Sequence, residues 1–578
     1  MPSQFQDIKE VFDANHLRLP ELNILVPDTN LYEIIAIQPT GAIAVHPDFV
    51  GHADQASAID KFNSFLELAV EQNCDLAITP EYSCPWEVVT RAIAENKLPA
   101  QRKLWILACE AITPQQLRGI IAAHSNVIWI HEPIPAGAGQ FLGVLAYVTK
   151  AEADTGGVKD VIVLQFKTEP MGGYAFERDH LLRGQTIYSW RNPQENIRLV
   201  SLLCSDALAF EGGNNNQCRF DLHPHLIFHP QLNLDPRHAG FSGYRDQLFN
   251  REISKHVEVL TLNWARGFSI PSLPDSAYGG STVYTKSEGF DISDARIVAN
   301  HERGFYFCYW HEHRTQLCLF DYDEHVFHFR MPKVLQDAAA VVARRTGPEM
   351  LALRNWNSVT KTWPEGVQVN DGYDTLCSEF NEQHCDYCAT APHNVVDRER
   401  LLMLATGNLP NLSPDSDWHQ LLNLDSFRAE RDERSKRLTF THEQALNSVS
   451  YRNEHMGRFI ALQMVILANP ANFPPTLHDL RNDWQVRPPQ HDDRFRFNLV
   501  SRSGQKQGAT VIFAGLVPFS QVTRLRDRIV RAWTKAETRR LVIWYQVQGD
   551  YLHLEPPTPA IDDDAELPDS YARSSSHE

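Results

Sequence analysis

The chain has 578 residues, of which 22% are charged and 43% are hydrophobic. This composition is ordinary for globular protein and excludes a wholly disordered chain. At roughly 150 residues per domain, the length corresponds to about four domains, or to two or three larger ones. The formal net charge of −18 argues against a protein coated in nucleic acid or held on anionic lipid, although a local basic patch is compatible with it.

Membrane and secretory segments are not expected. No apolar run approaches the roughly 18 residues of a membrane-spanning helix. The N-terminal stretch carries acidic residues where a signal peptide would have its apolar segment. The ten cysteines are scattered, which suits a reducing compartment better than a dense disulfide framework. We therefore expect a cytoplasmic protein.

Residues 22–335 alternate short apolar runs with helical or polar stretches, and residues 1–21 precede them as an extension. The alternation predicts one layered α/β domain with a large buried sheet. A helix is predicted at Ser57–Val70, where apolar residues recur at helical spacing. Strands are predicted at Glu33–Gln38, Asp75–Thr79, Trp105–Cys109, Val127–Ile130, Leu142–Val148, Val161–Phe166, Leu199–Cys204, Leu226–His229 and Val257–Asn263, with an antiparallel pair at Gly304–Trp310 and Gln316–Phe320.

The pattern changes after residue 335. Residues 336–440 hold short helix candidates, polar residues and prolines, which predict a mostly helical connecting region. Residues 441–555 predict a small α+β domain, and the acidic, serine-rich tail 556–578 is expected to be disordered. The expected elements of this domain are a helix from the Thr441–Gln444 capping box to Ala468, a strand at Phe495–Leu499, a strand at Thr510–Phe513, a helix at Val522–Ala536 and a strand at Leu541–Val547.

Three side chains that could carry chemistry lie at predicted strand ends. Glu81 and Lys167 each follow a strand, and Cys204 ends one. The loops beyond strand C-termini of an α/β sheet hold reactive groups rigidly while leaving them exposed. Taken singly, each residue has a simpler interpretation, because strand-end cysteines mostly fill cores and loop charges are mostly solvated.

Together the three groups form a coherent set for attack on a carbon–nitrogen bond. A thiol with a pKa near ~8.5 needs a base or a nearby cation to act as a nucleophile at neutral pH. Glu81 would accept the thiol proton, and Lys167 would stabilise the negative charge of the intermediate.

These motifs, in this order, resemble the nitrilase, or carbon–nitrogen hydrolase, superfamily and its Glu–Lys–Cys triad. ITPEYSCP (78–85) is similar to the glutamate motif, VLQFKTEP (163–170) to the lysine motif and LLCSDAL (202–208) to the cysteine motif. FERDHLLRG (176–184) resembles the segment after the lysine, which makes Glu177 the match for the family's supporting glutamate. The resemblance extends over about residues 22–335.

The resemblance implies an αββα sandwich that commonly pairs through its sheets, so a homodimer or higher homo-oligomer is expected. It also implies thiol-dependent hydrolysis of a small-molecule, non-peptide amide through an acyl-enzyme on Cys204. The backbone N–H of Ser205 would assist Lys167, and no metal or organic cofactor would be needed. The sequence departs from the family's pattern at LQFK before the lysine, at the Cys-Ser-Asp turn and in a polar insertion after it, and these departures leave the substrate undefined.

Two other function classes remain open. The nitrilase-like domain could be a scaffold in a signalling or binding protein whose C-terminal half recruits a partner or nucleic acid. An amine could also outcompete water, which would make the protein an amide-forming acyltransferase. No P-loop is present, and no Ser-Gly-Gly-x-Asp-Ser motif follows the first domain, which argues against a glutamine-dependent NAD synthetase.

A weak zinc pattern lies in the connecting region. Cys377, Cys385, Cys388 and His393 are close together, and the two-residue gap between Cys385 and Cys388 is typical of zinc ligands. No second pair of this spacing follows, so an incidental or structural role is favoured.

The last predicted helix is rich in arginine. This local positive charge could meet phosphate, nucleic acid or an acidic partner, but a solvated helix face is favoured. We expect the C-terminal domain to control access or partner choice and to contribute no catalytic group. The basic residues are Arg524, Arg526, Arg528, Arg531, Lys535, Arg539 and Arg540, against Asp527 and Glu537.

Overall fold

The computed structural model divides the chain into two compact units. The first contains residues 1–372, and the second contains most of the chain from residue 373 onward. The structure describes the chain except for residues 1–3, 26–30, 138, 193–196, 210–224, 236–238, 251–256, 276–278, 287–291, 311–314, 333–346, 367–394, 409–445, 489–495 and 557–578.

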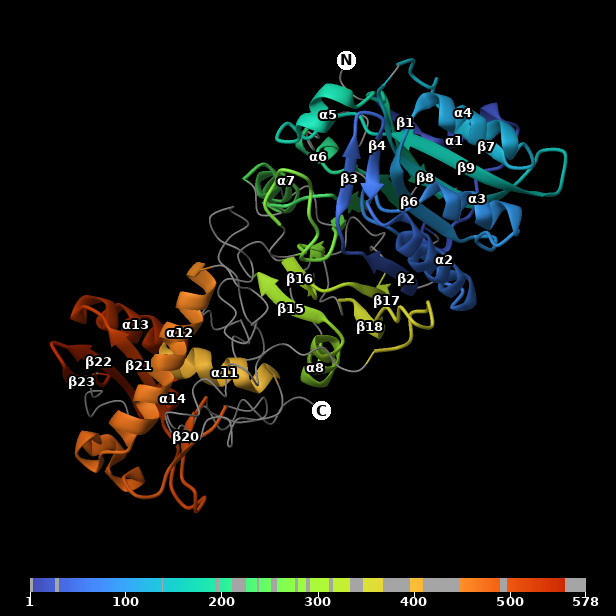
Figure 1. The fold of residues 1–578 in the computed structure, drawn as a ribbon. Coiled ribbons are helices and arrows are strands. Elements are labelled where there is room, and N and C mark those ends of the chain that lie inside the picture. Colours follow the sequence, from blue (N-terminus) through green and yellow to red (C-terminus); the bar gives the residue numbers. More distant parts are fainter. Residues whose placement is uncertain are drawn as a thin grey trace, which may run out of the picture. The chain divides into compact units, whose positions relative to one another are not determined.

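The first unit is built on two eight-stranded sheets (Figure 1). Both mix parallel and antiparallel neighbours, so the predicted α/β class is confirmed. The first sheet has the strand order β18 (Glu349–Arg354), β17 (His325–Pro332), β2 (Leu31–Gln38), β5 (Leu76–Ile78), β6 (Leu104–Ile112), β8 (Leu142–Glu152), β9 (Val158–Phe166) and β7 (Ile128–His131). The second has the order β1 (Gln4–Asp7), β10 (Thr186–Arg191), β11 (Arg198–Ser201), β12 (His225–Pro230), β13 (Val257–Leu262), β14 (Thr282–Lys286), β16 (Thr315–Phe320) and β15 (Phe305–Trp310).

Helices cover one face of each sheet. On the first sheet, Phe62 and Phe65 of one helix share a core with Ile35 and Leu107. On the second, Leu248 packs in a core with strand residues that are themselves fully buried. The covering helices of the first sheet are α2 (Gln55–Glu71), α3 (Trp86–Ala94) and α4 (Pro114–Ala123). The other helices of the unit are α1 (Ile8–Ala14), α5 (Ala175–His180), α6 (Asp206–Ala209), α7 (Ala239–Asn250) and α8 (Asp294–Glu302), with a 3₁₀ turn η1 (Asn23–Leu25).

The two sheets contact each other through their remaining faces. The rings of Phe320 on β16 and Phe327 on β17 have centroids 4.7 Å apart, and those of Tyr147 on β8 and Trp190 on β10 are 5.1 Å apart. Large aromatic side chains bury much apolar surface when they pair in this way. The core between the sheets therefore fixes how the strand ends of one sheet face those of the other.

Two segments extend these sheets beyond the predicted domain limits of 22 and 335. Strand β1 pairs with β10 in parallel, and Phe12 of α1 lies edge-on to Trp190 at 5.8 Å. Strand β18 pairs with β17, in a region that was expected to be mostly helical. A small hairpin of β3 (Ile43–His46) and β4 (Phe49–His52) was also not anticipated.

The second unit has a three-stranded sheet with a core on each face. Its strands are β21 (Thr510–Leu516), β22 (Leu541–Val547) and β23 (Asp550–Leu554), and a short pair β19 (Gln485–Val486) and β20 (Leu499–Val500) lies beside them. Trp544 packs toward α12 (Leu446–Ala461), whereas Ile543 packs toward α13 (Phe519–Ala532). The remaining elements are α11 (Val395–Thr406), α14 (Lys535–Thr538), a π-helical turn η2 (Leu462–Leu467) and the 3₁₀ turns η3 (Pro470–Asn472) and η4 (Pro475–Leu480).

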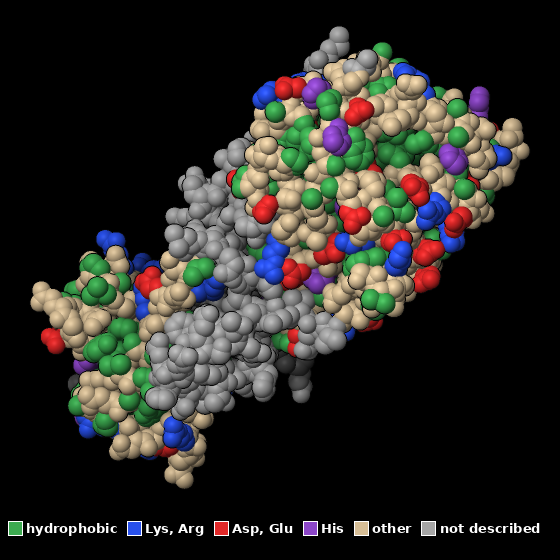
Figure 2. Space-filling model, in the orientation of Figure 1, with side chains coloured by type: hydrophobic (Ala, Val, Ile, Leu, Met, Phe, Trp, Pro, Cys, Tyr) green, Lys and Arg blue, Asp and Glu red, His purple; other side chains and the backbone are tan. Residues whose placement is uncertain are grey.

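Charged side chains of both signs lie interspersed on the face of the first unit that Figure 2 shows. Several form exposed pairs, such as Arg91 with Glu87 at 2.7 Å and Lys97 with Glu67 at 2.9 Å. Such exposed pairs contribute little to stability, because water and salt screen them. Among the described residues, no helix combines the length and the apolar character needed to cross a membrane.

We predict that Trp363→Ala destabilises the first unit, because residues beyond 335 contribute to its core. Trp363 is 3% exposed and belongs to the core under the first sheet, its Nε1 donates to the carbonyl of Lys61, and its ring centroid is 5.0 Å from that of Trp356. Loss of a buried tryptophan should cost about 3–5 kcal/mol, measured as a lower urea midpoint by circular dichroism. Val359→Ala is the control, because Val359 is 89% exposed. Equal midpoints in the two variants would contradict the prediction.

Candidate active site

Glu81 is held in a buried turn three residues after the end of β5 by contacts from three segments. The hydroxyl of Thr79 accepts a hydrogen bond from the N–H of Ala108 on the next strand. The indole of Trp264 donates to the Glu81 carbonyl at 2.8 Å, and the N–H of Leu232 donates to Oε2 of its carboxylate at 3.0 Å. The carboxylate is therefore fixed in direction although it lies in a loop.

Lys167 directly follows β9 and lies between two carboxylates. Its Nζ is 2.7 Å from Oε1 of Glu81, and 2.6 and 2.7 Å from the two carboxylate oxygens of Glu177 on α5. All three side chains are buried. Glu177 also accepts from the N–H of Met171, which ties α5 to the loop after β9.

The backbone around Lys167 is also tightly enclosed. Its carbonyl accepts from the N–H of Gly184 at 2.8 Å, and a Cβ at Gly184 would lie 2.5 Å from the carbonyl oxygen of Phe166. Only glycine permits so close an approach. This contact gives a physical reason for the glycine that closes the segment 176–184.

Burial and neighbouring charges together shift the pKa values of Glu81 and Lys167. Burial raises the pKa of Glu81 to about 7, with Glu177 adding to the rise and Lys167 opposing it. Burial lowers the pKa of Lys167, but the charges of Glu177 and Glu81 outweigh it, so that this pKa lies above its ordinary value. Lys167 is thus held as a cation, and Glu81 is poised to exchange a proton near neutral pH.

Cys204 lies in a strained turn three residues beyond the end of β11. Its φ is +41°, a left-handed conformation that costs a non-glycine residue roughly 1–2 kcal/mol. The N–H of Cys204 donates to the carbonyl of Pro230 at 2.9 Å, and its carbonyl is 2.9 Å from Nε2 of His229. The strand was predicted to continue to Cys204, but its pairing stops at Ser201.

The charges of Glu81, Lys167 and Glu177 also act on the thiol of Cys204. Burial raises the pKa of its thiol well above the ordinary value, with Glu81 and Glu177 adding to the rise and Lys167 opposing it. The N–H of Leu232, which donates to Glu81, also stabilises the thiolate. The structure therefore brings together the four predicted residues Glu81, Lys167, Glu177 and Cys204.

Asp206 joins the turn of Cys204 to the loop of Lys167, a role that the sequence did not reveal. Its carboxylate accepts hydrogen bonds from the N–H and hydroxyl of Thr168, from the N–H of Glu169 and from the N–H of Leu203. Burial raises the pKa of Asp206 to about 6, although Lys167 and these donors oppose the rise. The sequence signal was only an aspartate two residues after the cysteine.

The other predicted site residues are less tightly defined. The hydroxyl of Ser205 donates to the carbonyl of Glu169 at 2.5 Å, and the use of its backbone N–H remains a prediction. Aromatic and aliphatic side chains enclose this region, among them Tyr82, whose ring centroid is 5.5 Å from Nζ of Lys167. The weak zinc candidates Cys377, Cys385, Cys388 and His393 lie outside the described residues.

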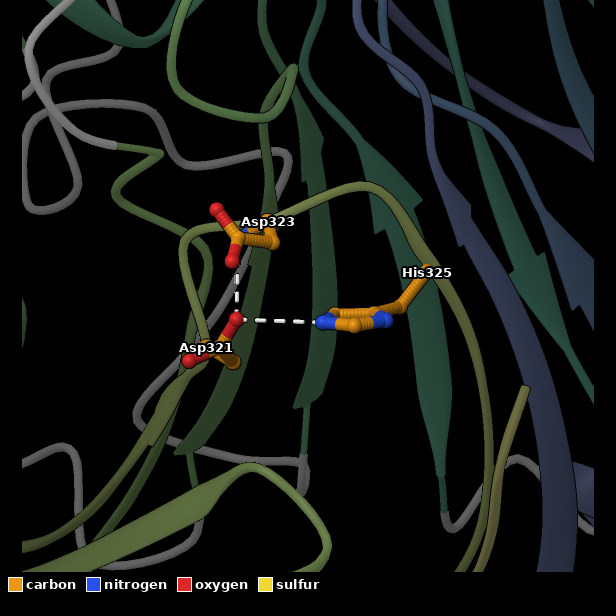
Figure 3. A group of neighbouring side chains, drawn as sticks. All are labelled: Asp321, Asp323 and His325. Carbon is orange, nitrogen blue, oxygen red and sulfur yellow. Dashed lines mark hydrogen bonds and ion pairs between the residues drawn. The ribbon is translucent and has the colours of Figure 1, made fainter. Parts of the chain in front are cut away.

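Asp321, Asp323 and His325 form a compact cluster that sequence reasoning did not select (Figure 3). Oδ1 of Asp321 accepts from the N–H of Asp323 at 2.9 Å and lies 3.1 Å from Nε2 of His325. The other ring nitrogen is 2.7 Å from Asn355, and Arg266 donates to Asp323. Because both ring nitrogens and these carboxylates already contact protein atoms, the cluster fits a structural role in the connection from β16 to β17 better than a metal site.

The contacts of Gln38 support a structural role for the cluster of Asp321, Asp323 and His325. It ends β2, its Nε2 donates to the carbonyls of Asp321 and Asp323, and its Oε1 accepts from the hydroxyl of Ser281. The buried side chain of Gln38 thus joins the first sheet to the β16–β17 connection. It also joins that sheet to Ser281, which directly precedes β14.

No family model matches the chain, and no curated protein matches its sequence. Among solved structures, a glutamine-dependent NAD(+) synthetase from Cytophaga hutchinsonii is similar over 44% of this chain and 39% of its own length, at 10% identity and a TM-score of 0.26. The match thus spans about two fifths of the synthetase, and its TM-score is too low to establish a shared fold.

We predict that Glu177→Gln moves the reactivity of Cys204 to lower pH. The negative charge of Glu177 raises the pKa values of both Glu81 and Cys204, so its removal should lower both. Alkylation of Cys204 by iodoacetamide, followed by mass spectrometry across pH, measures the shift. Glu177→Asp, which keeps the charge, should move the profile much less. An unchanged or upward-shifted midpoint in a folded Glu177→Gln variant would contradict the prediction.

Proposed function

We propose that the first unit is a thiol-dependent hydrolase that cleaves a non-peptide carbon–nitrogen bond, of the amide type, through a Glu81–Lys167–Cys204 triad. The observation that carries the proposal is the buried Lys167, which lies 2.7 Å from Glu81 and 2.6 Å from Glu177 beside a cysteine in a left-handed turn. Burying three charges together is costly, and strained residues cluster at functional sites.

The proposed reaction begins with transfer of the Cys204 thiol proton to the Glu81 carboxylate. The thiolate then attacks the amide carbon, and the carbonyl π electrons move to oxygen. The ammonium of Lys167 and the N–H of Ser205 stabilise this oxyanion. As the tetrahedral intermediate collapses, the carbon–nitrogen bond breaks, Glu81 gives its proton to the departing amine, and a thioester on Cys204 remains.

In the hydrolysis of the thioester, Glu81 again acts first as a base and then as an acid, and the sulfur of Cys204 is the leaving group. Glu81 takes a proton from water, the hydroxide adds to the thioester carbon, and the carbon–sulfur bond breaks. The thiolate of Cys204 recovers the proton from Glu81, and the product leaves as the acid. The chain's own groups and water balance every step, so the proposed mechanism calls for no cofactor.

The pKa values suit these roles. A general base works best when its pKa is near the working pH, and that of Glu81 is raised to about 7. Lys167 stays charged throughout, because its pKa lies above the ordinary value. Glu177 is a positioning residue in this proposal, since it holds Lys167 without reaching the reacting carbon.

We also propose that the first unit has the αββα sandwich that the sequence resemblance implies. Two sheets in contact, with helices on at least the outer face of each, are compatible with the αββα sandwich of carbon–nitrogen hydrolases. We further propose that this unit pairs with a second copy and that the second unit contributes no catalytic group.

The triad is tested by the reactivity of Cys204 with iodoacetamide at pH 7.5, followed residue by residue by mass spectrometry. We expect Cys204 to react faster than buried Cys84 and Cys109, and Glu81→Gln to slow it by about 10²-fold or more, the usual scale of a lost general base. Glu110→Gln is the matched control, because burial also raises the pKa of Glu110 to about 7 while its carboxylate accepts from His52 and Gln55. Equal rates in both variants would overturn the proposed triad.

The same pKa predicts a pH dependence. Proton transfer to Glu81 requires its ionised form, so the Cys204 alkylation rate should rise as pH increases through about 7. In Glu81→Gln that inflection should disappear, leaving only the rise from direct ionisation of the thiol at higher pH. A wild-type profile that lacks any inflection near neutral pH would contradict the assignment of Glu81 as the base.

A further inference from the structure

A hollow of about 390 Å³ lies in the second unit, bordered by α13, α12, the end of α11 and the end of β21. Its volume is within the range of roughly 300–1,000 Å³ that is typical of small-molecule sites. All of its lining residues belong to the second unit, whereas Cys204 belongs to the first.

The floor of this hollow is apolar. Ala514, Val517, Val522 and Leu525 line it, and Val522 is fully buried in the core between α13 and the sheet. At the end of α11, Gly407 has φ +71°, and a Cβ there would lie 2.9 Å from Leu525. The floor is therefore closely packed and offers a fixed surface to the apolar part of a ligand.

Three guanidinium groups also belong to the lining of the hollow. Arg458, Arg524 and Arg528 line the hollow, and none of its described lining residues is acidic. Arg524 and Arg528 lie four residues apart on α13, a spacing at which like charges destabilise a helix. The lining of the hollow is therefore basic, although the chain as a whole has a net charge of −18.

Arg458 is fixed in position. It extends from α12, pairs with Glu454, and only 19% of its side chain is exposed. Its Nε would be 2.6 Å from a Cβ at Gly515, a residue with φ +82°. The guanidinium thus crosses the end of β21 at a point where only glycine leaves room for it, so that it is largely ordered before any ligand binds.

We propose that this hollow binds a small organic anion whose phosphate or carboxylate head contacts Arg458, Arg524 and Arg528 and whose apolar body covers the floor. Guanidinium groups form paired, charge-assisted hydrogen bonds with both kinds of head. The apolar floor adds the requirement for a carbon body and distinguishes the site from one for a free inorganic ion.

The full-length protein is titrated by calorimetry with phenyl phosphate, benzoate and inorganic phosphate at low ionic strength. We expect saturable binding of one equivalent of phenyl phosphate or benzoate, with a lower Kd than that of inorganic phosphate. The tighter of the two aromatic anions identifies the preferred head group. Arg524→Gln and Arg528→Gln should each raise the Kd about tenfold, the scale of one lost charge-assisted contact.

Two further variants separate a built site from general charge attraction. Arg531→Gln removes the same charge from the same helix, but Arg531 donates to the carbonyl of Asp527 and does not line the hollow, so the Kd should change less than twofold. Val517→Thr keeps the shape of the floor and should weaken phenyl phosphate binding more than inorganic phosphate binding. Equal losses in Arg531→Gln and Arg524→Gln, or no saturable binding of any of the three anions, would overturn the proposal.

Discussion

The candidate active site depends on one buried cation. Lys167 has no exposed surface, and burying an ammonium ion costs several kcal/mol unless well-placed partners offset it. Two carboxylates do so here, at 2.7 and 2.6 Å. Because there are two, negative charge is in excess, and this excess adds to burial in raising the pKa of Glu81 to about 7. With Glu81 alone beside it, Lys167 would still be stabilised, but the pKa of Glu81 would be lower, because the charge of Glu177 contributes to its rise.

The carboxylate of Asp206 fixes the backbone next to this cation. Lys167 begins a loop whose N–H groups donate to Asp206, and Asp206 also accepts from the turn that carries Cys204. Cys204 and Lys167 therefore cannot move independently. This cross-link also explains how Cys204 persists at φ +41°, since a strained residue remains only where contacts from several segments hold it.

The sequence predicted those parts of this arrangement that depend on local pattern. Short apolar runs placed Glu81 and Lys167 correctly after strands, whereas Cys204 was assigned to a strand because its turn depends on the distant Pro230. Strand β17 (His325–Pro332) was missed because His328 and Arg330 interrupt its apolar run, although β2 and β18 pair with it on either side. The edge strand β1 (Gln4–Asp7) was missed because Phe5 is its single apolar residue.

A raised pKa alone does not distinguish a catalytic carboxylate. Glu81 and Glu110 are both buried, and both have a pKa raised to about 7, but the partners of Glu110 are the neutral His52 N–H and Gln55. Each carboxylate has a thiol nearby, Cys204 for Glu81 and Cys84 for Glu110, but Glu81 also has the ammonium of Lys167 at 2.7 Å. Proton transfer from Cys204 to Glu81 moves a negative charge within this buried cluster without creating one, so no additional charge must be desolvated. Lys167 can stabilise the anion in either position, and this is the physical basis on which we propose thiol chemistry at this cluster and not at Glu110.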